Sequence, residues 1–387
     1  MNSLAEILSN RSISTAERAE QAEKLILSIG MNDIVSNGSN IGAQGCIALA
    51  QAIPHCPSLI SIKLGRNNIG PEGCVALAQA IPHCPLLTTI NLSNNSIGRE
   101  GCVALTQAIP HCRSLKTIDL SYNNIGKKGC VALAQVIPHC PSLTTIDLGR
   151  NNIGPEGCIA LAQAISHCPS LTTIDLDRNN IGTVGCVALA QAIPHCPSLT
   201  TIILSDNNNG TVGCVALAQA IPNCPSLTTI ILDNNNFYDE GLAALAQAIK
   251  NSRTVTKMSL KNNCMLGNNC EQTFRFIEIF TERNKEFFRR WTHRRSFLLL
   301  VEAWLVLTAP PLSPSSSSSS SAAEGSTVTV TTTVEGGRRR DADRLDQLLL
   351  LVRGFLRLPD PIPATTRDLL SAILSQSGLV RSIASFL

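Results

Sequence analysis

The chain has 387 residues, of which 44% are hydrophobic and 3% aromatic, and its formal net charge at pH 7 is +3. This length allows two domains and a large core, while the near-neutral charge argues against a nucleic acid partner, because no basic excess exists to neutralise phosphates. The N-terminal residues are polar, with no apolar leader. The sixteen cysteines therefore do not indicate a secreted disulfide scaffold.

Residues 1–30 are expected to form an N-terminal helical cap. Ser14 and Glu17 have the spacing of a capping box, in which each side chain bonds the other residue's backbone N–H. Apolar residues from Ala19 to Ile26 then recur at helical spacing. This stripe predicts a helix that covers the first unit of the region that follows.

A repeat of 28 residues determines the fold class. Each copy has a Gly-Cys pair and a second cysteine ten residues later, so fourteen of the sixteen cysteines belong to the repeat. The pairs begin at Gly45, Gly73, Gly101, Gly129, Gly157, Gly185 and Gly213, and Gly241 continues the series with leucine in the cysteine position.

Within one unit, a strand pattern is followed by a helix pattern. Ile62 and Leu64 alternate as the inward residues of a strand do. Asn67 follows in a turn, where its short amide can bond backbone groups. Residues 73–81 have helical spacing, and Pro82 is expected to end this helix. One unit cannot bury such a mixed face alone, whereas stacked copies can.

The unit pattern L-x-x-I-x-L-x-x-N-x-I-G-x-x-G resembles the ribonuclease-inhibitor type of leucine-rich repeat, and is similar to the arrays of NOD-like receptors and the Ran GTPase-activating protein. The resemblance covers residues 31–271 and implies an α/β solenoid, a curved horseshoe with parallel strands on the concave face and helices on the convex face. The terminal units are degenerate, as capping requires. Asn209 replaces an inward isoleucine and Phe237 enlarges another core position. The repeated asparagines are Asn67, Asn95, Asn123, Asn151, Asn179, Asn207, Asn235 and Asn263.

Six units carry an adjacent His-Cys pair, from His55-Cys56 to His195-Cys196. A metal-binding ladder is one interpretation, but zinc needs four convergent ligands and adjacent side chains point in different directions. The favoured interpretation places each cysteine in the core and each histidine on a surface turn, with no metal and no cofactor. So many reduced thiols predict a cytoplasmic location, with the nucleus as the alternative.

The outward strand positions predict a protein-binding concave face. Adjacent strands lie about 4.8 Å apart, so equivalent residues should form stripes of acidic, basic and apolar character suited to a protein partner. The competing interpretation is a solvated face of duplicated repeats. Few aromatic anchors are present, which argues against tight inhibition. The candidate partner-binding residues are Lys63, Arg66, Asp119, Tyr122, Asp147, Arg150, Asp175, Arg178, Ile203 and Ile231.

Three further segments follow the repeats. Residues 272–308 are expected to form a C-terminal helical cap, whose apolar run from Phe297 to Ala309 is too short to span a bilayer. Interfacial membrane attachment is the less favoured alternative to a hydrophobic lid. Residues 309–343 read as a flexible Ser/Thr/Pro linker, and residues 344–387 as a helical tail, with fragments that resemble pieces of an F-box.

No nucleophile-and-base pattern and no G-x-x-x-x-G-K-[ST] motif occurs in the sequence, so an enzyme is not predicted. The leading hypothesis is an intracellular binding module or scaffold that recognises a protein on its concave face. The first alternative is a regulator of a small GTPase, although residues 272–308, with 7 basic and 4 acidic residues, differ from the acidic tail of the Ran activator. The second is a substrate adaptor of a ubiquitin ligase.

Overall fold

The structure is a computed structural model and describes residues 3–29, 32–263 and 273–286. The expected linker over 309–343 and tail over 344–387 lie outside the described residues, as does most of the expected cap over 272–308. Within the described residues, nine strands form one parallel sheet in chain order. They are β1 (Asp33–Val35), β2 (Ser61–Lys63), β3 (Thr89–Asn91), β4 (Thr117–Asp119), β5 (Thr145–Asp147), β6 (Thr173–Asp175), β7 (Thr201–Ile203), β8 (Thr229–Ile231) and β9 (Lys257–Ser259).

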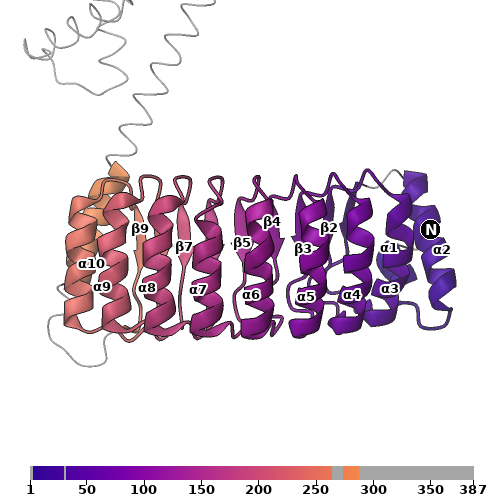
Figure 1. Cartoon of the computed structure of the whole chain (residues 1–387), viewed down its shortest axis with the longest axis horizontal. Coiled ribbons are helices and arrows are strands. Elements are labelled where there is room, and N and C mark those ends of the chain that lie inside the picture. The colour runs from indigo at the N-terminus through magenta and orange to yellow at the C-terminus, as the bar shows by residue number, and fades with distance from the viewer. Residues whose placement is uncertain (1–2, 30–31, 264–272, 287–387) are drawn as a thin grey trace, which may run out of the picture. The chain divides into compact units, whose positions relative to one another are not determined.

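A helix separates each strand from the next, and Figure 1 shows these helices side by side in chain order along one side of the sheet. The α/β solenoid predicted from the 28-residue spacing is therefore confirmed. Residues 273–286 are also helical. The helices with defined bounds are α1 (Leu4–Ser9), α2 (Thr15–Ile29), α3 (Gly42–Ala52), α4 (Gly70–Ala80), α5 (Gly98–Ala108), α6 (Gly126–Val136), α7 (Gly154–Ile165), α8 (Gly182–Ala192), α9 (Gly210–Ala220) and α10 (Asp239–Asn251).

The helix bounds differ from the sequence prediction. Helix α4 begins at Gly70, three residues before the predicted start, because the chain turns there with a φ of +67° and Pro71 fits the first helical turn. The α-helix ends at Ala80. Pro82 lies two residues further on, inside the short 3₁₀ helix η2 (Ile81–His83). The α-helix therefore ends before the proline, and the chain continues for three residues as a tighter 3₁₀ turn.

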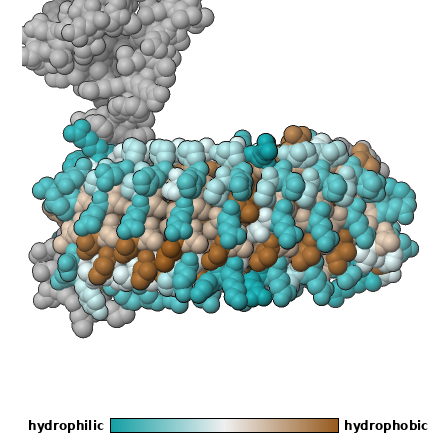
Figure 2. All heavy atoms as spheres, viewed as in Figure 1, coloured by the Kyte–Doolittle hydropathy of each residue, from teal (hydrophilic) through white to brown (hydrophobic). Residues whose placement is uncertain are grey.

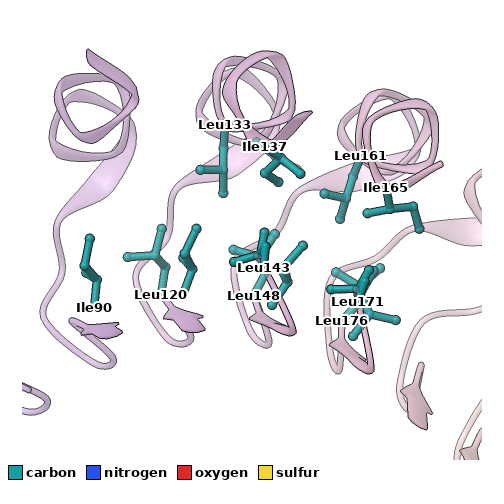
Figure 3. Close-up of a cluster of buried hydrophobic side chains, with 14 of the residues drawn as sticks. Ile90, Leu120, Leu133, Ile137, Leu143, Leu148, Leu161, Ile165, Leu171 and Leu176 are labelled. Carbon is teal, nitrogen blue, oxygen red and sulfur yellow. The ribbon is translucent and has the colours of Figure 1, made fainter. Parts of the chain in front are cut away.

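The core lies between the sheet and the helices. Figure 3 shows Leu133 of α6, and Ile137 of the 3₁₀ helix η4 (Ile137–His139) that follows it, pointing toward Leu143 and Leu148, which lie on either side of β5. All four side chains are fully buried. Each unit supplies the same set, so the core is continuous along the array and no unit has to bury its apolar face alone.

The predicted asparagine ladder forms and is wholly buried. The Asn151 side-chain oxygen accepts hydrogen bonds from the backbone N–H groups of Asn123 and Ile125, at 3.0 and 3.2 Å. The Asn151 amide donates in turn to the carbonyls of Leu120 and Leu148, at 2.8 and 2.9 Å. Each side chain thus satisfies backbone groups of its own unit and of the preceding one.

The Gly-Cys pair forms the contact between neighbouring helices. The Cys74 thiol lies 3.4 Å from the carbonyl oxygen of Gly101, in the next helix. A β-carbon on Gly101 would come within 2.9 Å of the Cys74 β-carbon and 3.1 Å of that of Ile97. Glycine is therefore required because the preceding cysteine occupies the space a side chain would take.

One unit breaks the pattern of the core. Asn209 is fully buried where the six preceding units have isoleucine. Its amide donates to the Leu204 carbonyl at 3.4 Å, whereas its side-chain oxygen has no hydrogen-bond partner within the part of the chain that is described. A buried polar atom without a partner costs about 1–3 kcal/mol.

The Gly-Cys contact predicts a stability effect. Gly101→Ala should lower the free energy of unfolding by about 1–3 kcal/mol, because the added carbon forces two packed helices apart. Urea unfolding followed by circular dichroism measures the change. Gly149→Ala is the matched control, since the nearest atom to its added carbon is 3.4 Å away. Equal effects of the two variants would contradict the explanation.

Asn209→Ile is expected to raise the free energy of unfolding by about 1 kcal/mol, since it removes the unpaired oxygen and restores the repeat residue. Asn207→Ile, two residues earlier, should instead destabilise by more than about 2 kcal/mol, because Asn207 is a fully bonded ladder member. The same unfolding measurement compares them. A loss of stability in Asn209→Ile would show that the buried amide is satisfied.

Candidate functional site

The strand face is the surface made by the first and third side chains of each strand. From β3 to β8 these side chains are half-buried, while the isoleucine between them is buried. The parallel register pairs each residue with the residue 28 positions on. Equivalent positions therefore form straight rows across the sheet.

The third strand positions form one such row, here named the register row. Its central part runs Asp119, Asp147, Asp175, Ile203 and Ile231 on five successive strands. The predicted acidic and apolar stripe is therefore a single continuous line. Lys63 lies in the same row but is separated from Asp119 by Asn91.

The three aspartates have unequal surroundings. Asp119 accepts hydrogen bonds from the Asn91 amide at 2.6 Å and the Ser121 hydroxyl at 2.7 Å. Among the residues that the structure describes, Asp147 accepts only from the Gly149 N–H, at 3.0 Å, and Asp175 only from the Asp177 N–H, at 2.9 Å. No described cation forms an ion pair with Asp147 or Asp175.

Burial and like charge therefore work against ionisation of this pair. Desolvation raises the pKa of Asp147 to about 7, and the neighbouring carboxylates of Asp175 and Asp119 add to the rise, against the Gly149 bond. Burial also raises the pKa of Asp175. The row consequently holds two carboxyl groups that no cation of the described residues stabilises in their charged form.

A second row, here named the edge row, follows the strands at the third residue past each strand end. Arg150 stacks on the Tyr122 ring, with its guanidinium carbon 4.5 Å from the ring centroid. Arg150 also pairs with Asp177 at 3.5 Å, and Arg178 pairs with Asp206 at 3.2 Å. Of the predicted site residues in this row, Tyr122 and Arg150 are in direct contact, Arg178 is the next member of the row, and Arg66 stands apart from Tyr122 across Asn94.

Sequence reasoning missed Asp177 and Asp206 as members of this surface. Asp206 occupies the Arg178 position of the next unit, so the 28-residue spacing already placed these opposite charges side by side. Asp177 lies two residues after Asp175, and its contact with Arg150 could be predicted only from the geometry of the turn. The two pairs engage the arginines nearest to the acidic part of the register row.

The edge row has a left-handed backbone. Arg66, Tyr122, Arg150 and Arg178 have φ between 52° and 61°, although bulky side chains rarely adopt this region. Other units place Asn94, Asp206, Asn234 and Asn262 there, residue types that tolerate it. Backbone preference thus does not explain the four bulky residues, and strain of this kind is concentrated at functional sites.

The cysteines and histidines lie as the favoured interpretation predicted. All fourteen repeat cysteines are free and buried, while the paired histidines, such as His83 and His111, are exposed. Burial raises the pKa of the Cys112 thiol to about 12, so it stays protonated. The described residues contain no group of three or more His, Cys, Asp or Glu side chains placed to hold a metal ion.

The helix side presents a second surface, on which Figure 2 shows rows of hydrophilic and hydrophobic side chains. Val184 and Val212 are 60% and 64% exposed there. Four preceding units have Glu72, Glu100, Lys128 and Glu156 at this position. Sequence reasoning missed this change, although comparing the units at one position reveals it.

Comparisons with known proteins match the repeat geometry. A family model described as a leucine-rich repeat matches residues 55–78, 83–105, 111–134, 139–162, 167–190, 195–218 and 223–246. No curated protein matches the sequence. Within the described residues, no helix has the length and apolar character needed to cross a membrane.

Two solved structures are similar to the chain. The leucine-rich repeat-containing protein LegL7 from Legionella pneumophila is 19% identical, with a TM-score of 0.42, and the match covers 69% of this chain and 87% of that one. The actin-binding site 2 of leiomodin-1 is 14% identical, with a TM-score of 0.37, and the match covers 44% of this chain and 96% of that one.

The raised pKa of Asp147 predicts a pH-dependent effect on stability. The folded protein binds a proton more tightly than the unfolded chain, whose carboxyl titrates near 3.9, so stability falls as pH rises from about 4 to about 7. Asp147→Asn removes this loss. The variant should match the wild type near pH 4 and be more stable by about 1–2 kcal/mol at pH 8, a value reduced for partial solvent exposure.

Urea unfolding across this pH range tests the prediction. Glu72→Gln is the control, because Glu72 is an exposed carboxylate on the helix side. An Asp147→Asn effect that is the same at pH 4 and pH 8 would contradict the assignment.

Proposed function

The chain is a leucine-rich repeat protein, and from this premise we propose that it is an intracellular protein-binding module that recognises its partner on the concave strand face and performs no catalysis. The 28-residue unit with a full helix supports the ribonuclease-inhibitor type of repeat. One observation carries the proposal: uncompensated carboxylates and isoleucines share a continuous row beside strained arginine and tyrosine residues.

The energetics of these rows support binding over a merely solvated face. Two half-buried carboxylates that have no cation among the described residues are unfavourable in the free protein. Arginine and tyrosine in the left-handed region add a cost that asparagine avoids in other units. A partner that contacts both rows would give these residues a favourable role. Tyrosine and arginine are also the residue types that most often supply binding energy at interfaces.

The cysteines support the intracellular part of the proposal. Each repeat adds two thiols to the core, and none of the fourteen is in a disulfide. A chain that relies on so many reduced thiols fits a reducing compartment. The cytoplasm is the proposed location, with the nucleus as the alternative.

The proposal predicts a selective loss of partners. In affinity purification of the full chain from native extract with mass spectrometry, Asp147→Arg/Asp175→Arg should lose at least one protein by more than about tenfold, because charge reversal at the interface costs several kcal/mol. The matched control is Glu72→Arg/Glu100→Arg, which makes the same charge change on the helix side.

A protein lost from the first variant and retained by the second and by wild type supports strand-face recognition. Circular dichroism must show the same helix content in all three proteins. If Asp147→Arg/Asp175→Arg captures every protein that the wild type captures, the proposal that the partner binds on the concave strand face is wrong.

A further inference from the structure

The strand face carries enough chemical detail to define the kind of segment it fits. Building on the proposed function, we infer that the register row binds an extended polypeptide segment with one basic side chain over Asp147 and Asp175, and an aliphatic side chain two or four residues further on over Ile203 and Ile231.

The basic position follows from the distribution of ion pairs. Arg150 and Arg178 are the nearest cations of the edge row, and they are engaged by Asp177 and Asp206. Asp147 and Asp175 therefore have no cation partner among the described residues. A lysine or arginine from another chain supplies the missing charge and donates to the carboxylate oxygens.

The aliphatic position follows from the same row. Ile203 and Ile231 occupy the aspartate position of the next two units and remain half-buried at the surface. Apolar area there is stabilised when a partner removes it from water. A free cation bound to the aspartates would not cover Ile203 and Ile231. Their apolar surface therefore favours a ligand that carries an aliphatic group as well as a positive charge.

The spacing selects an extended segment that runs across the strands. Neighbouring strands are about 4.8 Å apart, so the centre of the aspartate pair lies about 10 Å from the centre of the isoleucine pair. Side chains on one side of an extended chain repeat about every 6.7 Å. A side chain two residues further on therefore lies about 6.7 Å away and one four residues further on about 13 Å away, and the required distance of about 10 Å falls between these two distances. The long arms of lysine and arginine span the difference.

Two further rows frame this path. Thr145, Thr173, Thr201 and Thr229 begin the same strands and stay in register, so their half-buried hydroxyls form a polar row beside the aspartates and isoleucines. Hydroxyls of this kind can bond the backbone of an extended chain. The strained edge row bounds the other side, with Tyr122 48% exposed.

A peptide-display selection on the full chain tests the inference. Random twelve-residue peptides should be enriched for Lys or Arg followed, two or four residues later, by Leu, Ile or Val. A synthetic peptide of the enriched sequence should bind Asp147→Asn/Asp175→Asn at least tenfold more weakly. It should also bind Ile203→Ser/Ile231→Ser more weakly, and Glu72→Gln/Glu100→Gln unchanged.

The aspartate variant separates binding from folding, because neutral asparagine keeps the backbone hydrogen bonds and is expected to stabilise the array. In Thr145→Arg/Thr173→Arg, two large side chains should block the strand face, so a peptide that binds this variant more weakly than the wild type is one that binds to the strand face. Enriched peptides that lose affinity in this threonine variant but lack the basic–aliphatic pattern would overturn the inference and leave the proposed function standing.

Two other results would overturn the inference in different ways. If the selected peptides bind every strand-face variant as tightly as the wild type, the proposed function is contradicted as well. If Mg²⁺ or Ca²⁺ alone raised the melting temperature of the wild type but not of Asp147→Asn/Asp175→Asn, and no peptide bound, the aspartates would be assigned to a cation.

Discussion

The buried asparagine in each turn is the constraint on which the rest of the structure depends. Its side-chain oxygen takes the N–H groups of the preceding unit, and its amide donates to carbonyls of both units. A unit that slipped by one residue would leave several of these buried groups unpaired, at about 1–3 kcal/mol each. All units are therefore held in one phase, and every surface position becomes a row.

This fixed phase explains how much of the molecule could be predicted from the sequence. Once the 28-residue period is known, only one assignment fits the unit: Ile62 and Leu64 point into the core, and Asn67 lies in the turn that follows. The register row follows from the period alone. The start of α4 at Gly70 was not predictable from apolar spacing, because a backbone turn with positive φ sets it. Local turn geometry does not appear in hydrophobic periodicity.

The chemistry of the candidate site was less predictable than its position. The aspartate row was evident, but the raised pKa of Asp147 depends on how far the sheet and its neighbours exclude water. The ion pair of Arg150 with Asp177 depends on where a left-handed turn directs a long side chain. Sequence spacing defines which residues are neighbours, whereas burial and turn geometry define what those neighbours do.

Duplication in a register-locked array also explains how the apolar part of the row arises. Residues 182–209 and 210–237 are near copies, and both contain the exposed valine of the helix side and the isoleucine of the register row. Copying one unit placed Ile203 beside Ile231 and Val184 beside Val212 without further substitution. The three aspartates, like the isoleucines, recur in successive units. The edge row is less uniform, because Tyr122 lies next to Asn94 and Arg178 lies next to Asp206, so the bulky residues at this position are not shared by every copy. Duplication therefore accounts for the width of the apolar patch, and the strained edge beside the unpaired carboxylates is the part that requires a functional explanation.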